Sequence, residues 1–157
     1  MPTTIGLDTS FVVGLLDEKD LWHAAAVQLY ADIQAHDFQM AAFDCVLAET
    51  IGALARRVHE KRRVADLASL LERLHTKFPK KSITWLYPTL PDIYDEVVAL
   101  VEQSGGELNF NDALIADSCR KREIVMFASF DPDFDRHAPW LKRVARPDQL
   151  SDTLEGQ

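Results

Sequence analysis

The chain has 157 residues, of which 47% are hydrophobic and 27% are charged, and its formal net charge at pH 7 is −8. The length fits one domain with a single buried core, and the composition excludes a disordered or fibrous protein. No apolar run reaches the roughly 18 to 20 residues that span a bilayer, and the N-terminus lacks the pattern of a signal peptide, so we expect a cytoplasmic protein without membrane contact.

Strand-forming and helix-forming patterns alternate along the chain. The expected strands cover residues 3–7, 38–43, 82–87, 124–128 and 141–145, and the expected helices cover 11–16, 22–33, 45–59, 64–78, 91–103 and 111–122. Asp44 and Asn111 are the expected N-caps of two helices, and Gly105-Gly106 ends another. Strands that alternate with helices of this length predict a three-layer αβα domain with a mainly parallel sheet, covering residues 1–147. The polar segment 148–157 is expected to be a loose tail.

Four acidic residues are expected at one edge of this sheet. Asp8 and Asp131 directly follow predicted strands, whereas Glu49 and Asp112 lie near the starts of predicted helices. The carboxyl ends of parallel strands share one edge with the N-termini of the helices that connect them, and ligands of open α/β proteins bind there. Each acid taken singly fits turn or helix-end chemistry, but four at one edge indicate a site.

A cluster of carboxylates favours a bound cation, because each negative charge raises the pKa of its neighbours. Oxygen ligands without accompanying Cys or His favour Mg²⁺ or Mn²⁺ over zinc. One ion held firmly, with or without a second that enters with a phosphate, is the arrangement that cleaves phosphate esters. The sequence therefore predicts metal-dependent phosphate ester hydrolysis.

Four pieces of sequence around these acids resemble the PIN-domain family, and within it the VapC-type toxins of toxin–antitoxin pairs. They are residues 7–11 (LDTSF), 46–50 (VLAET), 111–116 (NDALIA) and 129–134 (SFDPDF), and their order covers nearly the whole chain. No single piece is specific, whereas the ordered set is.

The resemblance implies a Mg²⁺- or Mn²⁺-dependent endoribonuclease with RNA as substrate, an antitoxin protein as partner and a homodimer as the common assembly. Asp8, Glu49, Asp112 and Asp131 would be its catalytic, metal-binding acids. Ser129 would occupy the family's hydroxyl position, where Thr is commoner, and Ser10 would be a hydrogen-bonding residue beside the site. Asp133 is a candidate fifth carboxylate or a substitute for Asp131, since spacing alone does not rank Asp131, Asp133 and Asp135.

We interpret Asp44, Asp117 and Asp135 as capping or solvent-facing residues. Two other functions remain open: a PIN-like fold that binds RNA or protein without cleavage, and a housekeeping RNA-processing nuclease. The sequence names neither the RNA target nor the metal.

The charge is unevenly distributed, because nine basic and three acidic residues lie between Arg56 and Lys81, a net charge of +6. This segment is either a solvated helix face or a strip for a phosphate backbone or an acidic partner. It begins about two turns after Glu49 on the same predicted helix. The candidate contacts to RNA or antitoxin are Arg56, Arg57, Lys61 and Arg62.

Overall fold

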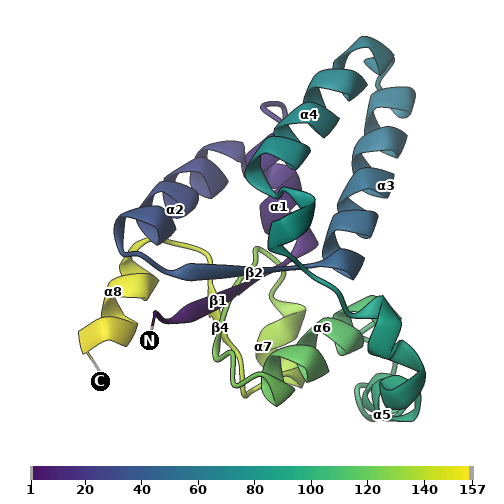
Figure 1. The fold of residues 1–157 in the computed structure, drawn as a ribbon, viewed down its shortest axis with the longest axis vertical. Helices are drawn as coiled ribbons and strands as arrows, with labels where there is room; N and C mark the ends of the chain where they lie inside the picture. The colour runs from purple at the N-terminus through teal and green to yellow at the C-terminus, as the bar shows by residue number, and fades with distance from the viewer. Residues whose placement is uncertain (1, 156–157) are drawn as a thin grey trace.

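The computed structural model describes residues 2–155, and over these residues the chain forms five strands and eight α-helices (Figure 1). The strands are β1 (Thr4–Leu7), β2 (Gln39–Phe43), β3 (Ile83–Thr84), β4 (Met126–Ala128) and β5 (Lys142–Val144). The helices are α1 (Thr9–Leu16), α2 (His23–Ala35), α3 (Asp44–Glu60), α4 (Leu67–Lys77), α5 (Leu90–Gln103), α6 (Phe110–Lys121), α7 (Asp133–His137) and α8 (Asp148–Glu155).

The strands form one sheet in the order β3-β2-β1-β4-β5, and every neighbouring pair is parallel. Gly6 of β1 pairs with Ala41 of β2 on one side and with Phe127 of β4 on the other. The chain first builds the sheet from β1 towards β3 and then crosses over to β4 and β5. The direction of winding therefore changes between β1 and β4, and in open parallel sheets ligands bind beyond the carboxyl ends of such a strand pair.

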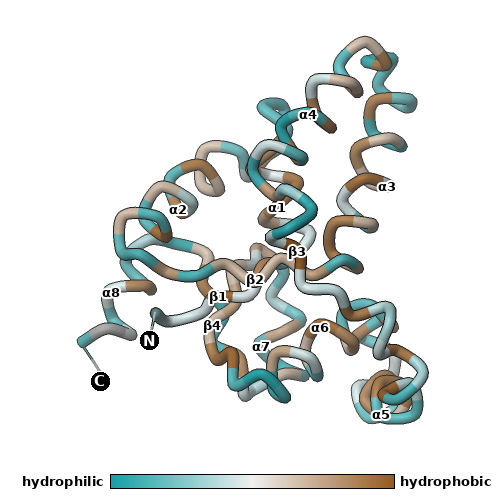
Figure 2. Tube along the Cα trace, viewed as in Figure 1, coloured by the Kyte–Doolittle hydropathy of each residue, from teal (hydrophilic) through white to brown (hydrophobic). Residues whose placement is uncertain are grey.

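Helices cover both faces of the sheet, which confirms the predicted three-layer αβα architecture. In Figure 1, α1, α2 and the α3–α4 hairpin lie on one side of the strands, and α5, α6 and α7 lie on the other. Figure 2 shows brown and teal segments alternating along the helices, the pattern of amphipathic helices with one face buried.

The central strands are buried on both faces, as a parallel sheet between two helical layers requires. Ile5, Leu7, Met126 and Phe127 are all fully buried. Gly6 allows the close packing of β1, because a Cβ atom there would lie 2.9 Å from the ring of Phe127. Any side chain at this position would push β1 away from its neighbours.

Three predicted element ends differ from the structure. The N-cap of α6 is Asn109, whose side chain accepts the backbone N–H of Asp112, so the prediction of Asn111 was wrong. Phe43 is the N-cap of α3, and Asp44 is already the first helical residue. The strand expected over residues 82–87 is reduced to Ile83–Thr84, because 3₁₀ turns at Lys80–Ser82 and Tyr87–Thr89 take its two ends. The Gly105-Gly106 ending of α5 is confirmed, with φ of 65° and 81°.

The segment after Pro147 is ordered over residues 148–155, so the expectation of a loose tail was wrong for that part. It forms α8, and Leu150 is fully buried. The Gln149 side chain accepts the backbone N–H groups of Ala145 and Arg146, which fixes the start of the helix. Residues 156–157 of the expected tail lie outside the described residues, and the domain boundary at Pro147 stays a prediction.

Among the helices of residues 2–155, none has the length and apolar character needed to cross a membrane.

Candidate functional site

The four predicted acids lie on elements that meet at the carboxyl edge of the sheet. Asp8 occupies the N-cap position of α1, directly after β1, and its backbone N–H still pairs with Ala128 of β4. Asp131 follows β4, Asp112 lies in the first turn of α6, and Glu49 lies in the second turn of α3. This is the edge where the winding direction changes, so the topology brings together acids that are far apart in sequence.

Asp8 is the centre of a hydrogen-bonded cluster that joins β1 to β4. Only 4% of its surface is exposed. The hydroxyls of Ser129 and Ser10 donate to the same carboxylate oxygen, Oδ2, at 2.7 and 2.8 Å. The backbone N–H groups of Phe130 and Asp131 in turn donate to Ser10 and Ser129. Both serines therefore fix the orientation of Asp8.

The pKa of Asp8 is raised above its usual value of 3.8. Burial is the main cause, and the charge of Asp131 adds to it, whereas the hydrogen bonds from Ser129, Ser10 and the backbone of Thr9 act in the opposite direction. Within residues 2–155, the groups that form hydrogen bonds with this carboxylate are neutral, namely two hydroxyls and a backbone N–H group. The ionised form of Asp8 is thus poorly compensated.

Asp112 shows the convergence of the acids most directly. Its pKa is raised from 3.8 to about 7, first by burial and then by the negative charges of Asp8, Glu49 and Asp131, while a hydrogen bond with the backbone of Asn109 acts in the opposite direction. Such mutual influence requires the four carboxylates to lie close together. The four carboxylates therefore share one electrostatic environment.

Glu49 is held from α6 by a residue that the sequence analysis assigned another role. The Asn111 amide donates to Glu49 Oε2 at 3.3 Å. Because Asn109 provides the helix cap, the side chain of Asn111 is free to cross to α3. The signal for this role was the position of Asn111 beside Asp112, in the same resemblant piece.

The three aspartates after β4 have different surroundings. The Asp131 carboxylate accepts the backbone N–H of Asp133 at 2.9 Å, and its charge acts on both Asp8 and Asp112. Asp133 is half-buried in the first turn of α7. Asp135 is exposed and forms an ion pair with Arg143 at 2.9 Å, in line with the prediction of a solvent-facing residue. These surroundings favour Asp131 over Asp133 and Asp135 as a site acid.

Two acids interpreted as capping or solvent-facing are buried instead. Asp44 accepts the backbone N–H groups of Leu86 and Tyr87, each at 2.9 Å, and thereby ties the segment after β3 to α3. Asp117 is fully buried in α6 and forms ion pairs with Arg120 and Lys121. For Asp44 the interpretation was wrong because its partners lie 42 and 43 residues later in the sequence. Asp117 has partners three and four residues away on its own helix, but its burial depends on packing that the local pattern does not show.

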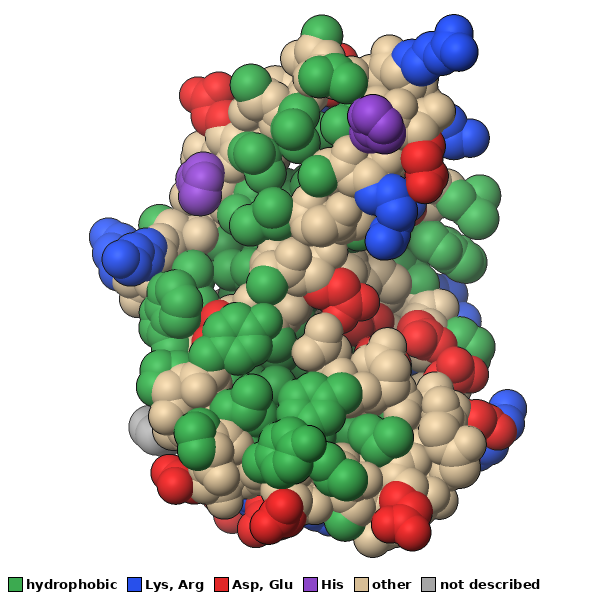
Figure 3. Space-filling model, turned by 90° about the vertical axis from the view of Figure 1, so that its right-hand side faces the viewer, with side chains coloured by type: hydrophobic (Ala, Val, Ile, Leu, Met, Phe, Trp, Pro, Cys, Tyr) green, Lys and Arg blue, Asp and Glu red, His purple; other side chains and the backbone are tan. Residues whose placement is uncertain are grey.

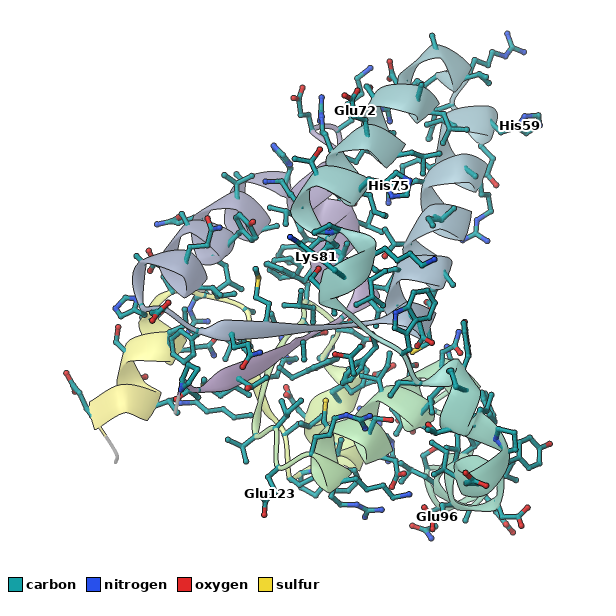
Figure 4. The ribbon with its side chains drawn as sticks, viewed as in Figure 1. His59, Glu72, His75, Lys81, Glu96 and Glu123 are labelled. Atoms are coloured by element: carbon teal, nitrogen blue, oxygen red, sulfur yellow. The ribbon has the colours of Figure 1, made fainter. Side chains whose placement is uncertain are left out.

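The basic strip is only partly available to a ligand. Arg57 forms ion pairs with Asp17 at 3.1 Å and with Asp20 at 2.7 Å, so its charge is already used within the protein. Arg56, Lys61 and Arg62 are exposed to solvent. Figure 4 shows that His59, near this end of α3, points away from the α3–α4 hairpin, while His75 of α4 lies between the two helices.

An apolar groove of about 320 Å³ lies between α3, α4 and the segment after β3, to one side of the carboxylates. Its lining includes Leu47, Ile51, Leu74, Phe78 and Trp85. Figure 3 views the face that carries α3 and α5, and shows acidic side chains in the middle of that face between areas of apolar ones.

The donor set of the rim fits a hard divalent cation. It consists of carboxylate oxygens, two of them on acids with a raised pKa, and a cation would relieve the repulsion that raises it. Within the described part of the chain, no three Asp, Glu, His or Cys side chains are already gathered into a metal site. A cation would thus have to draw these carboxylates together.

The fold and the rim define an open parallel α/β domain with an acidic site at the point where the winding changes. The chain belongs to the PIN domain family, whose model matches residues 5–138. No curated protein matches the sequence.

Solved structures share the fold at low sequence identity. VapC20 of Mycobacterium tuberculosis, described as a toxin that cleaves the Sarcin-Ricin loop, is 23% identical with a TM-score of 0.64, over 83% of this chain and 92% of that one. VapBC2 of Rickettsia felis, bound to a DNA fragment from its promoter, is 18% identical with a TM-score of 0.63, over 90% of this chain and 98% of that one. PAE2754 of Pyrobaculum aerophilum is 20% identical with a TM-score of 0.62, over 100% of both chains.

Proposed function

We propose that this PIN domain is a divalent-metal-dependent endoribonuclease and acts as the toxin of a toxin–antitoxin pair. The observation that carries the proposal is the convergence of Asp8, Glu49, Asp112 and Asp131 at the carboxyl edge of the sheet, where burial and the other three carboxylates raise the pKa of Asp112 to about 7. Acids are kept this close, without a compensating cation from the protein, where a metal ion and a phosphate are to be bound.

The metal would be held by Asp8, Glu49, Asp112 and Asp131. Asp133 would be a fifth ligand or a substitute for Asp131. The oxygen ligands favour Mg²⁺ or Mn²⁺. When bound, such an ion neutralises charge on phosphate oxygens and lowers the pKa of water.

The chain's own residues orient these acids and handle protons. Ser10 and Ser129 hold Asp8 through Oδ2, and Asn111 holds Glu49 through Oε2, so that both carboxylates keep a fixed direction before a ligand arrives. Asp112 is the acid whose carboxylate takes up and releases a proton near neutral pH. Binding of a cation would therefore release a proton from Asp112, and metal affinity would fall as the pH drops below about 7.

The toxin role draws on the sequence resemblance and on the shared fold. VapC20 is described as a toxin that cleaves the Sarcin-Ricin loop, and VapBC2 as bound to DNA from its promoter. By analogy, the partners of this chain are RNA, an antitoxin and a second copy of the chain. Arg56, Lys61 and Arg62 provide the positive charge that the RNA backbone or acidic antitoxin residues would contact. A neighbouring gene that encodes a small DNA-binding protein with an arginine-bearing tail would support the pairing.

The decisive variant is Asp112→Asn, which keeps the size of the side chain and removes its charge. We expect cleavage of single-stranded RNA to fall by about 100-fold or more. Wild-type activity should disappear in EDTA and return with Mg²⁺ or Mn²⁺ but not with zinc alone. Asp95→Asn, an equal change on the exposed side of α5, serves as the control and should leave cleavage unchanged. Cleavage by Asp112→Asn at the wild-type rate would contradict the site, and wild-type cleavage in excess EDTA would contradict the metal.

Expression in a bacterial host separates the toxin from the alternatives. Growth arrest by the wild type, absent with Asp112→Asn, supports a toxin. Cleavage in vitro without growth arrest indicates a processing nuclease instead. RNA binding without cleavage indicates a binding module.

A further inference from the structure

Trp22 and Phe130 form an aromatic stack beside the acidic rim. Their ring centroids are 4.9 Å apart and the rings are within 7° of parallel. Phe130 is only 9% exposed, whereas 45% of the surface of Trp22 remains exposed. The buried phenyl ring thus supports an indole that is open to solvent.

This stack is connected directly to the site acids. Phe130 stands between Ser129 and Asp131, and its backbone N–H donates to Ser10 at 3.0 Å. Ser10 in turn donates to Asp8 at 2.8 Å. The segment that positions Asp131 therefore also positions the ring on which Trp22 lies.

The backbone of Trp22 is fixed by polar contacts from neighbouring elements. Its N–H donates to Asp20 at 2.8 Å, and Asp20 is bound by Arg57 of α3 at 2.7 Å. Its carbonyl accepts the N–H of Ala26 at 2.8 Å, and the next residue, His23, contacts the carbonyl of Gly14 in α1 at 2.8 Å. Because the backbone of Trp22 is already fixed, the indole loses little additional freedom when a ligand stacks on it.

Charge restricts what this surface can bind in an RNA. The protein has a net charge of −8, and Asp131 follows Phe130 directly in the chain, so away from a bound metal ion the phosphate backbone gains little attraction at this surface. The face of a nucleobase carries no charge and stacks on aromatic side chains whatever its identity. An unpaired base is thus the part of the RNA that suits this site.

We propose that the exposed face of Trp22 stacks on an unpaired nucleobase next to the phosphate held at the acidic rim, and so selects single-stranded RNA. The inference rests on the proposed nuclease function. It adds a residue at the N-terminus of α2 that would position the RNA, a role that the four acids do not have.

The test measures RNA binding without cleavage, in an Asp112→Asn background, with a short single-stranded oligoribonucleotide that carries a fluorescent label. Trp22→Leu should weaken binding about 10-fold, and Trp22→Phe should retain most of it, because phenylalanine still offers a ring for stacking. Trp85→Leu is the matched control, since Trp85 is similarly exposed, at 47%, and lies on the groove of α3 and α4. Thermal melting of each variant checks that the fold is kept.

A second readout follows the indole itself. The chain contains three tryptophans, so Trp85→Phe with Trp140→Phe leaves Trp22 as the only one. Its fluorescence should be quenched when the oligonucleotide is added, and an oligonucleotide of abasic sugar-phosphate should leave it unchanged. Equal affinity of wild type and Trp22→Leu, or an unquenched Trp22, would overturn the stacking.

These measurements separate the two proposals. If wild type cleaves RNA but Trp22→Leu binds and cleaves it equally well, the stacking is wrong and the nuclease stands. If wild type does not cleave RNA but the oligonucleotide quenches Trp22, the nuclease is wrong, and stacking holds as a property of an RNA-binding module.

Discussion

The two ends of helix α1 carry buried aspartates with opposite electrostatics. Asp8 precedes the helix, has neutral partners and a raised pKa. Asp17 follows the helix, and although burial alone would raise its pKa, hydrogen bonds from Arg63, the backbone of Lys19 and Arg57 lower it to about 2. The helix dipole would predict the reverse order, because it favours an anion at the N-terminus.

Burial raises the pKa at both ends of the helix, so the comparison shows that the partners, rather than the helix position, account for the difference between the two pKa values. The carboxylate oxygens of Asp17 lie 2.9 Å from Arg63 and 3.1 Å from Arg57, which compensates the charge within the protein. Among the described residues, the side-chain partners of Asp8 are neutral hydroxyls, so a bound cation would supply the compensation that Arg57 and Arg63 give to Asp17. The charge of one acidic cluster is compensated within the protein, and that of the other is not.

The largest expected effect on stability belongs to Asp17. Asp17→Asn leaves Arg57 and Arg63 without their shared carboxylate and should lower the free energy of unfolding by about 3–5 kcal/mol, as measured in urea at pH 7. The pKa of Asp17 is lower in the folded state than its usual value of 3.8, so this contribution is present above pH 4 and is lost as the pH falls towards 2.

Asp66→Asn is the matched control for that cluster. Asp66 pairs with the same Arg63, but 44% of its side chain is exposed, so its loss should cost less than about 1 kcal/mol. Equal losses for the two variants would mean that Asp17 is no more important to the fold than a surface ion pair.

At the acidic rim, removal of a carboxylate charge is expected to stabilise the protein. In metal-free buffer at pH 8, Asp112→Asn should raise the free energy of unfolding, because it removes a negative charge that the neighbouring carboxylates repel. We expect an increase of about 2 kcal/mol, which is less than the pKa shift alone would give because Asp112 is partly exposed. The pKa of Asp112 is raised to about 7, so the wild type loses stability as the pH rises from 4 to 7, and the advantage of the variant grows over that range and then levels off.

Adding Mg²⁺ or Mn²⁺ should reverse this order, because the wild type gains more from a bound cation than the variant does. Melting temperatures at pH 4.5 and pH 8, with and without the metal, provide the four measurements. If the variant is less stable than the wild type in EDTA at pH 8, Asp112 stabilises the fold, as Asp17 does, and the expected repulsion at the rim is wrong.

The sequence predicted the rim better than the Asp17 cluster for a physical reason. Strand ends and helix starts are local signals, and parallel topology brings them to one edge, so Asp8, Glu49, Asp112 and Asp131 were predictable as a group. Asp17 depends on Arg63, 46 residues later in the sequence, and no local pattern announces that pair. Asp44 and Asp117 were misinterpreted for the same reason, since their burial depends on tertiary contacts.

Arg57 shows how tertiary contacts also change the meaning of a charge pattern. Counting charges placed it in the basic strip with Arg56, Lys61 and Arg62, but it is bound to Asp17 and Asp20. It thereby belongs to the structural cluster, and only the exposed members remain candidates for contact with RNA.

The smallest expected effect separates these two groups of basic residues. Arg56, Lys61 and Arg62 are replaced with Gln in the Asp112→Asn background. The slope of log RNA affinity against log salt concentration should become less steep by up to about 2, since each lost phosphate contact removes about 0.7 from the slope for a single strand. The free energy of unfolding should change little, because these side chains are exposed. The control Lys142→Gln with Arg146→Gln removes exposed charge from β5 and the segment after it, and should leave the slope unchanged.

Arg57→Gln should instead lower the free energy of unfolding, because it removes one of the ion pairs of Asp17. Equal slopes for wild type and the triple variant would make the strip a solvated helix face, while a stable Arg57→Gln variant would remove Arg57 from the structural cluster.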